Sequence, residues 1–70
     1  MKRYKQNFSE QLKALRMERN VTQVALAAAI GTSKGLISLW ENGLREPTLS
    51  NLLALSDFFE VSLDEMVGRT

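Results

Sequence analysis

The sequence predicts a small all-α fold, a single domain of five short helices. Apolar residues recur three or four positions apart instead of alternating as they do in strands. Residues that favour helix starts and residues that favour helix ends alternate along the chain. Seventy residues leave room for one domain. We therefore expect a basic N-terminal arm over residues 1–7 and one helical domain over residues 8–70.

The first helix is expected over residues 8–19. Asn7 and Glu10 have the spacing of a capping pair. The apolar residues that follow at helical spacing are Phe8, Leu12 and Leu15. Asn20 suits the turn that ends the helix, because asparagine tolerates a positive φ.

Two short helices joined by a tight turn are expected next. Thr22 can cap a helix over residues 23–30, and Gly31 supplies the positive φ that ends it. Residues 31–33 separate it from a third helix over residues 34–42, which ends at Gly43. Two helices with this tight glycine turn are the core of a helix-turn-helix unit, here residues 23–42.

The last two helices are expected to close the core over the first three. Thr48 caps a fourth helix that reaches about residue 59, and Ser62 with Glu65 forms a capping box for a fifth helix to residue 67. The apolar residues that these helices supply are Leu49, Leu52, Leu55, Phe59, Val61, Leu63 and Met66.

Composition argues against an enzyme. The chain has no cysteine and no histidine, which removes disulfides, thiolate nucleophiles, the commonest metal ligand and the usual general base. We expect no metal and no cofactor. The basic N-terminus is not followed by an apolar stretch, and the longest uncharged run, residues 21–33, contains polar residues and glycine. Neither a signal peptide nor a membrane span is predicted, so a cytoplasmic protein is expected.

Charge is distributed unevenly along the chain. The net charge is +1, but residues 1–56 carry +4 and residues 57–70 carry −3. A large positive excess, typical of non-specific nucleic-acid binders, is absent. The asymmetry fits a protein with one end toward phosphate, and it also arises by chance in small domains.

One face of the third helix is expected to lie outside the core. On a helical wheel, Ile37 and Trp40 mark the buried side. The opposite side holds Gly35, Ser38, Leu39 and Asn42, with Lys34 at the margin. This side is the candidate binding face.

These features together resemble a known family, the lambda-repressor and Cro-like (Xre-type) helix-turn-helix domains. The motifs that carry the resemblance are Leu12-x-x-Leu15-Arg16, Thr22-Gln23-x-x-Leu26-Ala27, Ile30-Gly31, Ile37, Trp40-Glu41-Asn42-Gly43 and Pro47. The resemblance covers residues 8 to about 67. It implies a five-helix lambda-repressor-like domain in a transcription regulator, most in keeping with a repressor, with its third helix in the DNA major groove.

The resemblance also implies which residues contact DNA. Gln23, at the start of the second helix, falls where the family contacts phosphate, and Asn42 matches another position that often does so. The positions that reach base edges fall on Ser33, Lys34, Gly35, Ser38 and Leu39. Arg45 is placed to touch phosphate.

Several of these residues differ from the family's usual choice. Lys34 can donate to guanine, Ser38 can serve either kind of partner, and Leu39 offers apolar contact with a thymine methyl. Glutamine or arginine is more common on this face. Val24, Leu36, Leu39 and the alanine run are therefore also considered as a protein-binding patch, as in an antitoxin or a module that engages another regulator. Leu36 fits the edge of the core better than a contact.

Two further expectations concern charged residues. Arg16 and Glu41 match an internal ion pair between the first and third helices, the alternative being two solvated charges. Lys2, Arg3 and Lys5 form either a DNA-contacting arm or a solubilising tail.

We also expect a homodimer on double-stranded DNA. The candidate seam is Phe58 with Met66 or Val67, and the alternative places Phe58 under the fifth helix. Glu60 stands where the family often has glycine, which indicates mild strain or a different turn.

Overall fold

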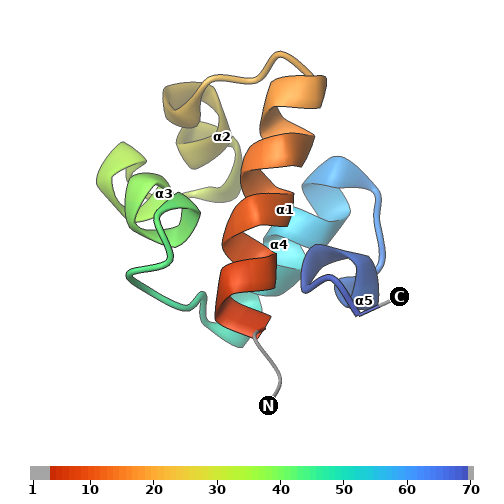
Figure 1. The fold of residues 1–70 in the computed structure, drawn as a ribbon. Helices are drawn as coiled ribbons and strands as arrows, with labels where there is room; N and C mark the ends of the chain where they lie inside the picture. Colours follow the sequence, from red (N-terminus) through yellow and green to blue (C-terminus); the bar gives the residue numbers. More distant parts are fainter. Residues whose placement is uncertain (1–3, 70) are drawn as a thin grey trace.

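The computed structural model describes residues 4–69, except for the side chains of residues 5 and 6. These residues form five helices and no strand (Figure 1). The helices are α1 (Tyr4–Glu18), α2 (Gln23–Ile30), α3 (Lys34–Glu41), α4 (Leu49–Phe59) and α5 (Leu63–Met66). The predicted all-α fold of five helices is confirmed.

The core lies where α1 meets the other helices. In Figure 1, α2 and α3 lie on one side of α1, α5 lies on the other, and α4 runs behind it. The buried apolar side chains come from all five helices: Phe8, Leu12, Leu15, Leu26, Ala27, Ile37, Trp40, Leu55, Phe59 and Met66. Trp40 meets the ring of Phe8 edge-on, with 6.1 Å between ring centroids. Because this pair joins α1 to α3, it fixes one side of α3 against the core.

Hydroxyl caps begin four of the helices. The side-chain oxygens of Thr22, Ser33, Thr48 and Ser62 each accept the backbone N–H three residues further on, at 3.0 to 3.2 Å. Three of these caps were predicted. Ser33 was assigned to DNA contact, and it also caps α3.

Residues with positive φ end α2 and α4 and form the turns after α1 and α3. Gly31 has φ 77° and Asn20 has φ 56°, as the sequence predicted. Glu60 caps α4 with φ 57°. This left-handed conformation is unfavourable for a residue with a Cβ, so of the two expectations for this position, mild strain or a different turn, the positive φ favours strain.

The first helix begins earlier than predicted. It starts at Tyr4, so Asn7 lies inside the helix and does not cap it. Tyr4 lies one turn before Phe8, and both side chains line a hollow with Pro47 and Leu52. This apolar lining explains why the helix extends over residues that the basic composition assigned to an arm. Lys2 and Arg3 lie outside the described residues, as does the side chain of Lys5.

Expectations about three residues of the last helices are corrected. Leu49 and Leu63, both expected in the core, are 68% and 37% exposed. Each is the first residue of its helix, α4 or α5, and the side chains that these helices bury come later in them. Met66 was expected both in the core and in a dimer seam. It is fully buried, because α5 packs onto the core through this side chain, so the core expectation is confirmed and the seam expectation is wrong. Phe58 is 38% exposed and packs edge-on against Phe59. Within residues 4–69, no helix has the length and apolar character needed to cross a membrane.

Candidate nucleic-acid interface

One face of α3 is free of the core. Ile37 and Trp40 on the opposite side are fully buried. The outward face consists of Lys34, Gly35, Ser38, Leu39 and Asn42; Ser38 and Leu39 are half-buried and the other three are exposed. Ser33, also exposed, precedes this face at the N-cap, and Arg45 is exposed in the loop that follows. The structure thus brings the predicted base-contacting positions to one surface.

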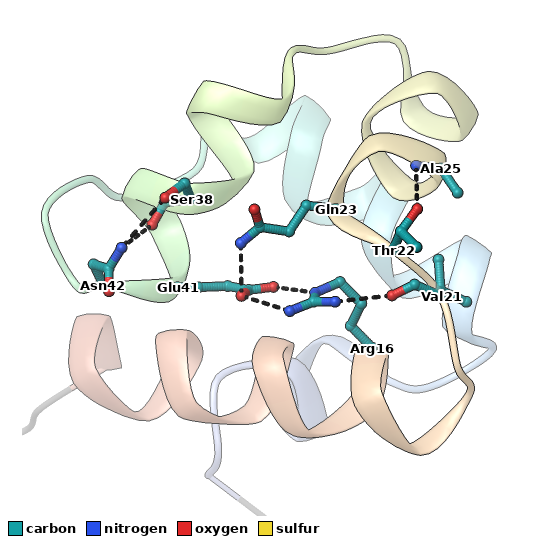
Figure 2. A network of polar contacts seen from close by, with 8 residues as sticks. All are labelled: Arg16, Val21, Thr22, Gln23, Ala25, Ser38, Glu41 and Asn42. Carbon is teal, nitrogen blue, oxygen red and sulfur yellow. Dashed lines mark hydrogen bonds and ion pairs between the residues drawn. The ribbon is translucent and has the colours of Figure 1, made fainter.

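An ion pair holds α3 against α1. Arg16 Nε lies 2.6 Å from Glu41 Oε2, and Arg16 Nη2 lies 3.0 Å from Glu41 Oε1 (Figure 2). Arg16 Nη1 donates to the Val21 carbonyl at 2.9 Å. The side chains of Arg16 and Glu41 are only 14% and 4% exposed. One guanidinium therefore connects α1, the turn before α2, and α3.

The environment of Arg16 favours its charged form. The hydrogen bond to Glu41 raises the pKa of Arg16, burial lowers it, and the charge of Glu41 raises it further. The net direction is upward. Arg16 therefore keeps its charge near neutral pH and holds α3 through its two hydrogen bonds to Glu41.

Gln23 belongs to the same network. Its side-chain nitrogen donates to Glu41 Oε1 at 3.1 Å (Figure 2). The resemblance implies that Gln23 contacts phosphate, and the structure places it at the first residue of α2, half-buried. One amide hydrogen is held by Glu41, which leaves the second hydrogen and the carbonyl oxygen for a ligand. Nothing in the sequence spacing indicated this contact between α2 and α3.

Asn42 and Ser38 are paired on the outward face of α3. The Asn42 side-chain nitrogen lies 2.9 Å from the Ser38 carbonyl oxygen and 3.3 Å from the Ser38 hydroxyl oxygen (Figure 2). The pair was not predicted, although residues four apart on a helix are neighbours. Asn42 was assigned to phosphate, and in this structure its amide nitrogen faces its own helix.

The starts of α2 and α3 present positive potential. Neither first turn contains an acidic residue, and both caps, Thr22 and Ser33, are neutral hydroxyls. The free backbone N–H groups and the helix dipole favour an anion at such a terminus. Lys34 adds its charge at the first residue of α3. Among residues 4–69, no three acidic, histidine or cysteine residues gather where they could hold a metal ion.

Arg19 is a positioning residue that sequence reasoning missed. Its Nη2 donates to the Phe59 carbonyl at 3.0 Å, and its guanidinium carbon lies 5.9 Å from the centre of the Phe59 ring. The contact joins the end of α1 to the end of α4, where a cation also favours the helix dipole. Arg19 and Phe59 are 40 residues apart, so no local pattern in the sequence predicts that they contact each other.

Known proteins are similar to this chain in sequence and in fold. The profile of the helix-turn-helix family matches residues 12–66. The transcriptional activator BcrR of Enterococcus faecalis is 40% identical over 61 residues, which are 87% of this chain and 30% of BcrR. The cryptic phage CTXphi transcriptional repressor RstR of Vibrio cholerae is 37% identical over 65 residues, which are 93% of this chain and 54% of RstR.

A solved structure extends this similarity to the fold. The P22 c2 repressor, solved in complex with synthetic operator 9T, has a TM-score of 0.86 and 35% identity, covering 93% of this chain and 98% of that chain. The chain spans about a third of the length of BcrR and about half of that of RstR. Its motifs, its five helices and these relatives agree: the chain belongs to the helix-turn-helix family, among the lambda-repressor and Cro-like (Xre-type) domains.

Proposed function

We propose that this domain binds DNA sequence-specifically in a cytoplasmic transcription regulator, with the outward face of α3 in the major groove. The observation that carries the proposal is the contrast between the two sides of α3. Ile37 and Trp40 are fully buried, whereas Lys34, Gly35 and Asn42 are exposed. The P22 c2 repressor, which shares the fold, was solved with an operator.

The start of α2 is proposed to contact the DNA backbone. Gln23 has one amide hydrogen left for a phosphate oxygen, and the N–H groups of the first turn favour the same anion. Such contacts position the protein, while contacts to base edges carry the sequence information. We assign base contacts to Ser33, Lys34, Gly35, Ser38 and Leu39, and a phosphate contact to Arg45.

Two copies are proposed to bind an inverted repeat. One α3 contacts too few bases for strong discrimination, and dimers of helix-turn-helix domains bind half-sites about 34 Å apart. The domain measures 33 × 24 × 22 Å, so two copies fit side by side at that spacing. Phe58 and Val67 remain candidates for the seam, because both retain exposed surface. Repression is the proposed effect, as in the names of RstR and the P22 c2 protein.

Selection of bound sequences from a random pool of DNA duplexes tests the proposal. The expected product is an inverted repeat whose half-site centres lie one helical turn apart. Native mass spectrometry of the complex is expected to give two chains per duplex. A single asymmetric half-site with one chain would contradict dimerisation, and no enrichment at moderate salt would contradict DNA binding.

A protein partner is the second candidate function. Val24 on α2 is 60% exposed, which favours an apolar contact there. Leu36, considered for the same patch, packs against the core instead, so the patch is smaller than expected. A protein-only module would enrich no sequence in the DNA selection.

A further inference from the structure

Gly35 is a glycine that the backbone does not require. The chain has four glycines, and the other three, Gly31, Gly43 and Gly68, have the positive φ that favours glycine. Gly35 does not have a positive φ and is the second residue of α3. Glycine inside a helix is less favourable than alanine, because glycine loses more conformational freedom on folding. The helix would therefore be more stable with alanine at this position.

Packing does not require a glycine at residue 35 either. We considered which atoms of the described residues a Cβ on Gly35 would meet, apart from its two neighbours in the chain and the backbone of its own helix. Within 4 Å there is one, Ser33 Oγ, at 3.9 Å. This is an ordinary van der Waals distance, and the same oxygen already accepts the Leu36 backbone N–H at 3.1 Å. The space beside Gly35 is therefore open, and no contact within the described part of the chain explains why the side chain is missing.

Leu39 lies one turn after Gly35 on the same outward face. Residues four apart on a helix are neighbours, and a leucine side chain in a helix leans over the turn before it. Leu39 is half-buried, so part of its surface is accessible. None of its side-chain atoms lies within 4 Å of the place that a Gly35 Cβ would occupy. The bare backbone of Gly35 and the side chain of Leu39 thus border an open space on α3, which we call the α3 notch.

We propose that the α3 notch receives the 5-methyl group of one thymine in each half-site, and that Gly35 lacks a side chain to leave room for this methyl. The inference rests on the proposed function. In helix-turn-helix domains, the first residues of the recognition helix are the ones that approach base edges. Thymine is the only base that presents a methyl group in the major groove. The side chain that alanine would place at residue 35 is also one methyl group, so the notch has the size for its ligand.

Deoxyuridine tests the methyl group alone, because it differs from thymidine only by the missing 5-methyl. Each thymine in one half-site of the selected sequence is replaced in turn, and Kd is measured for each duplex. Replacement of one particular thymine is expected to weaken binding by the wild-type chain about 2- to 5-fold, the contribution of one buried methyl group. If no replacement weakens binding, the inference is wrong.

Variants of the two residues that border the notch locate the methyl. Gly35→Ala fills the notch, so it is expected to bind the uracil duplex at least as tightly as the thymine duplex. The same variant is expected to raise the melting temperature by about 2 to 6 °C, so its loss of thymine preference is not a failure to fold. Leu39→Ala removes the apolar wall, and its thymine preference is expected to fall below about twofold. Each preference is a ratio within one variant, so a lower folded fraction does not alter it.

The control is Ser50→Ala, which changes the second residue of α4, also exposed. It is expected to keep the wild-type preference for thymine over uracil. If Gly35→Ala also keeps this preference, the methyl does not enter the notch and the inference is wrong, even where Leu39→Ala abolishes the preference. If Gly35→Ala lowers the melting temperature, the fold does require a glycine, which contradicts the inference. If the wild-type chain binds no duplex at all, the proposed function fails, an outcome distinct from tight binding that is indifferent to uracil.

Discussion

Gln23 and Arg16 donate to the same oxygen of Glu41, at 3.1 and 3.0 Å. The first residue of α2 and the last residue of α3 are thereby joined through a carboxylate that is itself held by α1. The two elements proposed to contact DNA, the start of α2 and the outward face of α3, are therefore fixed relative to each other before any ligand arrives.

Replacing Glu41 with alanine is expected to destabilise the fold by about 3 kcal/mol, because it leaves the guanidinium of Arg16 buried without its partner. It is also expected to weaken DNA binding at concentrations where the variant is folded, because α2 and α3 lose their common anchor. Urea unfolding followed by the fluorescence of the single tryptophan, Trp40, measures the first effect. A loss no larger than that of an exposed Glu18→Ala control would contradict this account.

The stability that Arg16 contributes is expected to be independent of pH between about 8 and about 10. The folded protein raises the pKa of Arg16 above its ordinary value, chiefly through the hydrogen bond to Glu41. A raised pKa in the folded state means that the contribution is complete below the unfolded pKa and is lost only as the pH rises through the folded pKa. The measurement is the difference in unfolding free energy between wild type and Arg16→Met at several pH values. A difference that declines between pH 8 and 10 would refute the assignment.

Gln23 and Lys34 are expected to differ in what they contribute to binding. Lys34→Ala should cost roughly 1 to 3 kcal/mol at the selected site and flatten the preference at one base step. Gln23→Ala should weaken all duplexes alike and leave the salt dependence almost unchanged, because glutamine carries no charge. Titrations against the selected site, its single-base variants and a scrambled duplex at two salt concentrations measure both. An equal loss on every duplex for Lys34→Ala would make lysine a phosphate contact only.

Glu60→Gly is expected to stabilise the domain by about 0.5 kcal/mol. Relief of the left-handed strain, of order 1 kcal/mol, exceeds the extra entropy that glycine gives the unfolded chain. The matched control is Asn20→Gly, since Asn20 has a similar φ but asparagine tolerates it better. Thermal unfolding of both variants should show the larger gain at residue 60, and an equal gain at both positions would argue against strain.

Local signals in the sequence predicted most of the fold, and long-range contacts explain what they missed. Thr22, Thr48 and Ser62 cap their helices as expected, because a cap needs only the residue and its first turn. The predicted start of α1 was wrong because Tyr4 lines a hollow together with Pro47, which is distant in sequence. Met66 was predicted correctly in the core and wrongly in a dimer seam, because a helix of four residues is too short for a helical wheel to show which side is buried.

In the candidate site too, local patterns predicted some features, and contacts between distant residues were missed. The helical wheel predicted the outward face of α3, because Ile37 and Trp40 mark the other side unambiguously. The ion pair of Arg16 and Glu41 followed from the family resemblance and not from spacing. Two hydrogen bonds depend on how the helices cross, and no local sequence pattern predicts them. They join Gln23 to Glu41 and Arg19 to Phe59.

The caps of α2 and α3 are neutral hydroxyls, although an acidic cap would give the fold more stability. An acidic cap would also weaken the proposed binding to DNA. Aspartate at Ser33 would cap α3 as well as serine does and would add a favourable charge at the positive end of the helix dipole. Ser33→Asp is therefore expected to raise the unfolding free energy by about 0.5 kcal/mol, and to weaken binding to every duplex because its charge repels the DNA backbone. Selection for thermal stability alone would drive this position toward an acidic residue. A stabilised variant of this domain, for example from consensus or computational redesign, should therefore be checked at residues 22 and 33 before its DNA affinity is compared with that of the parent chain.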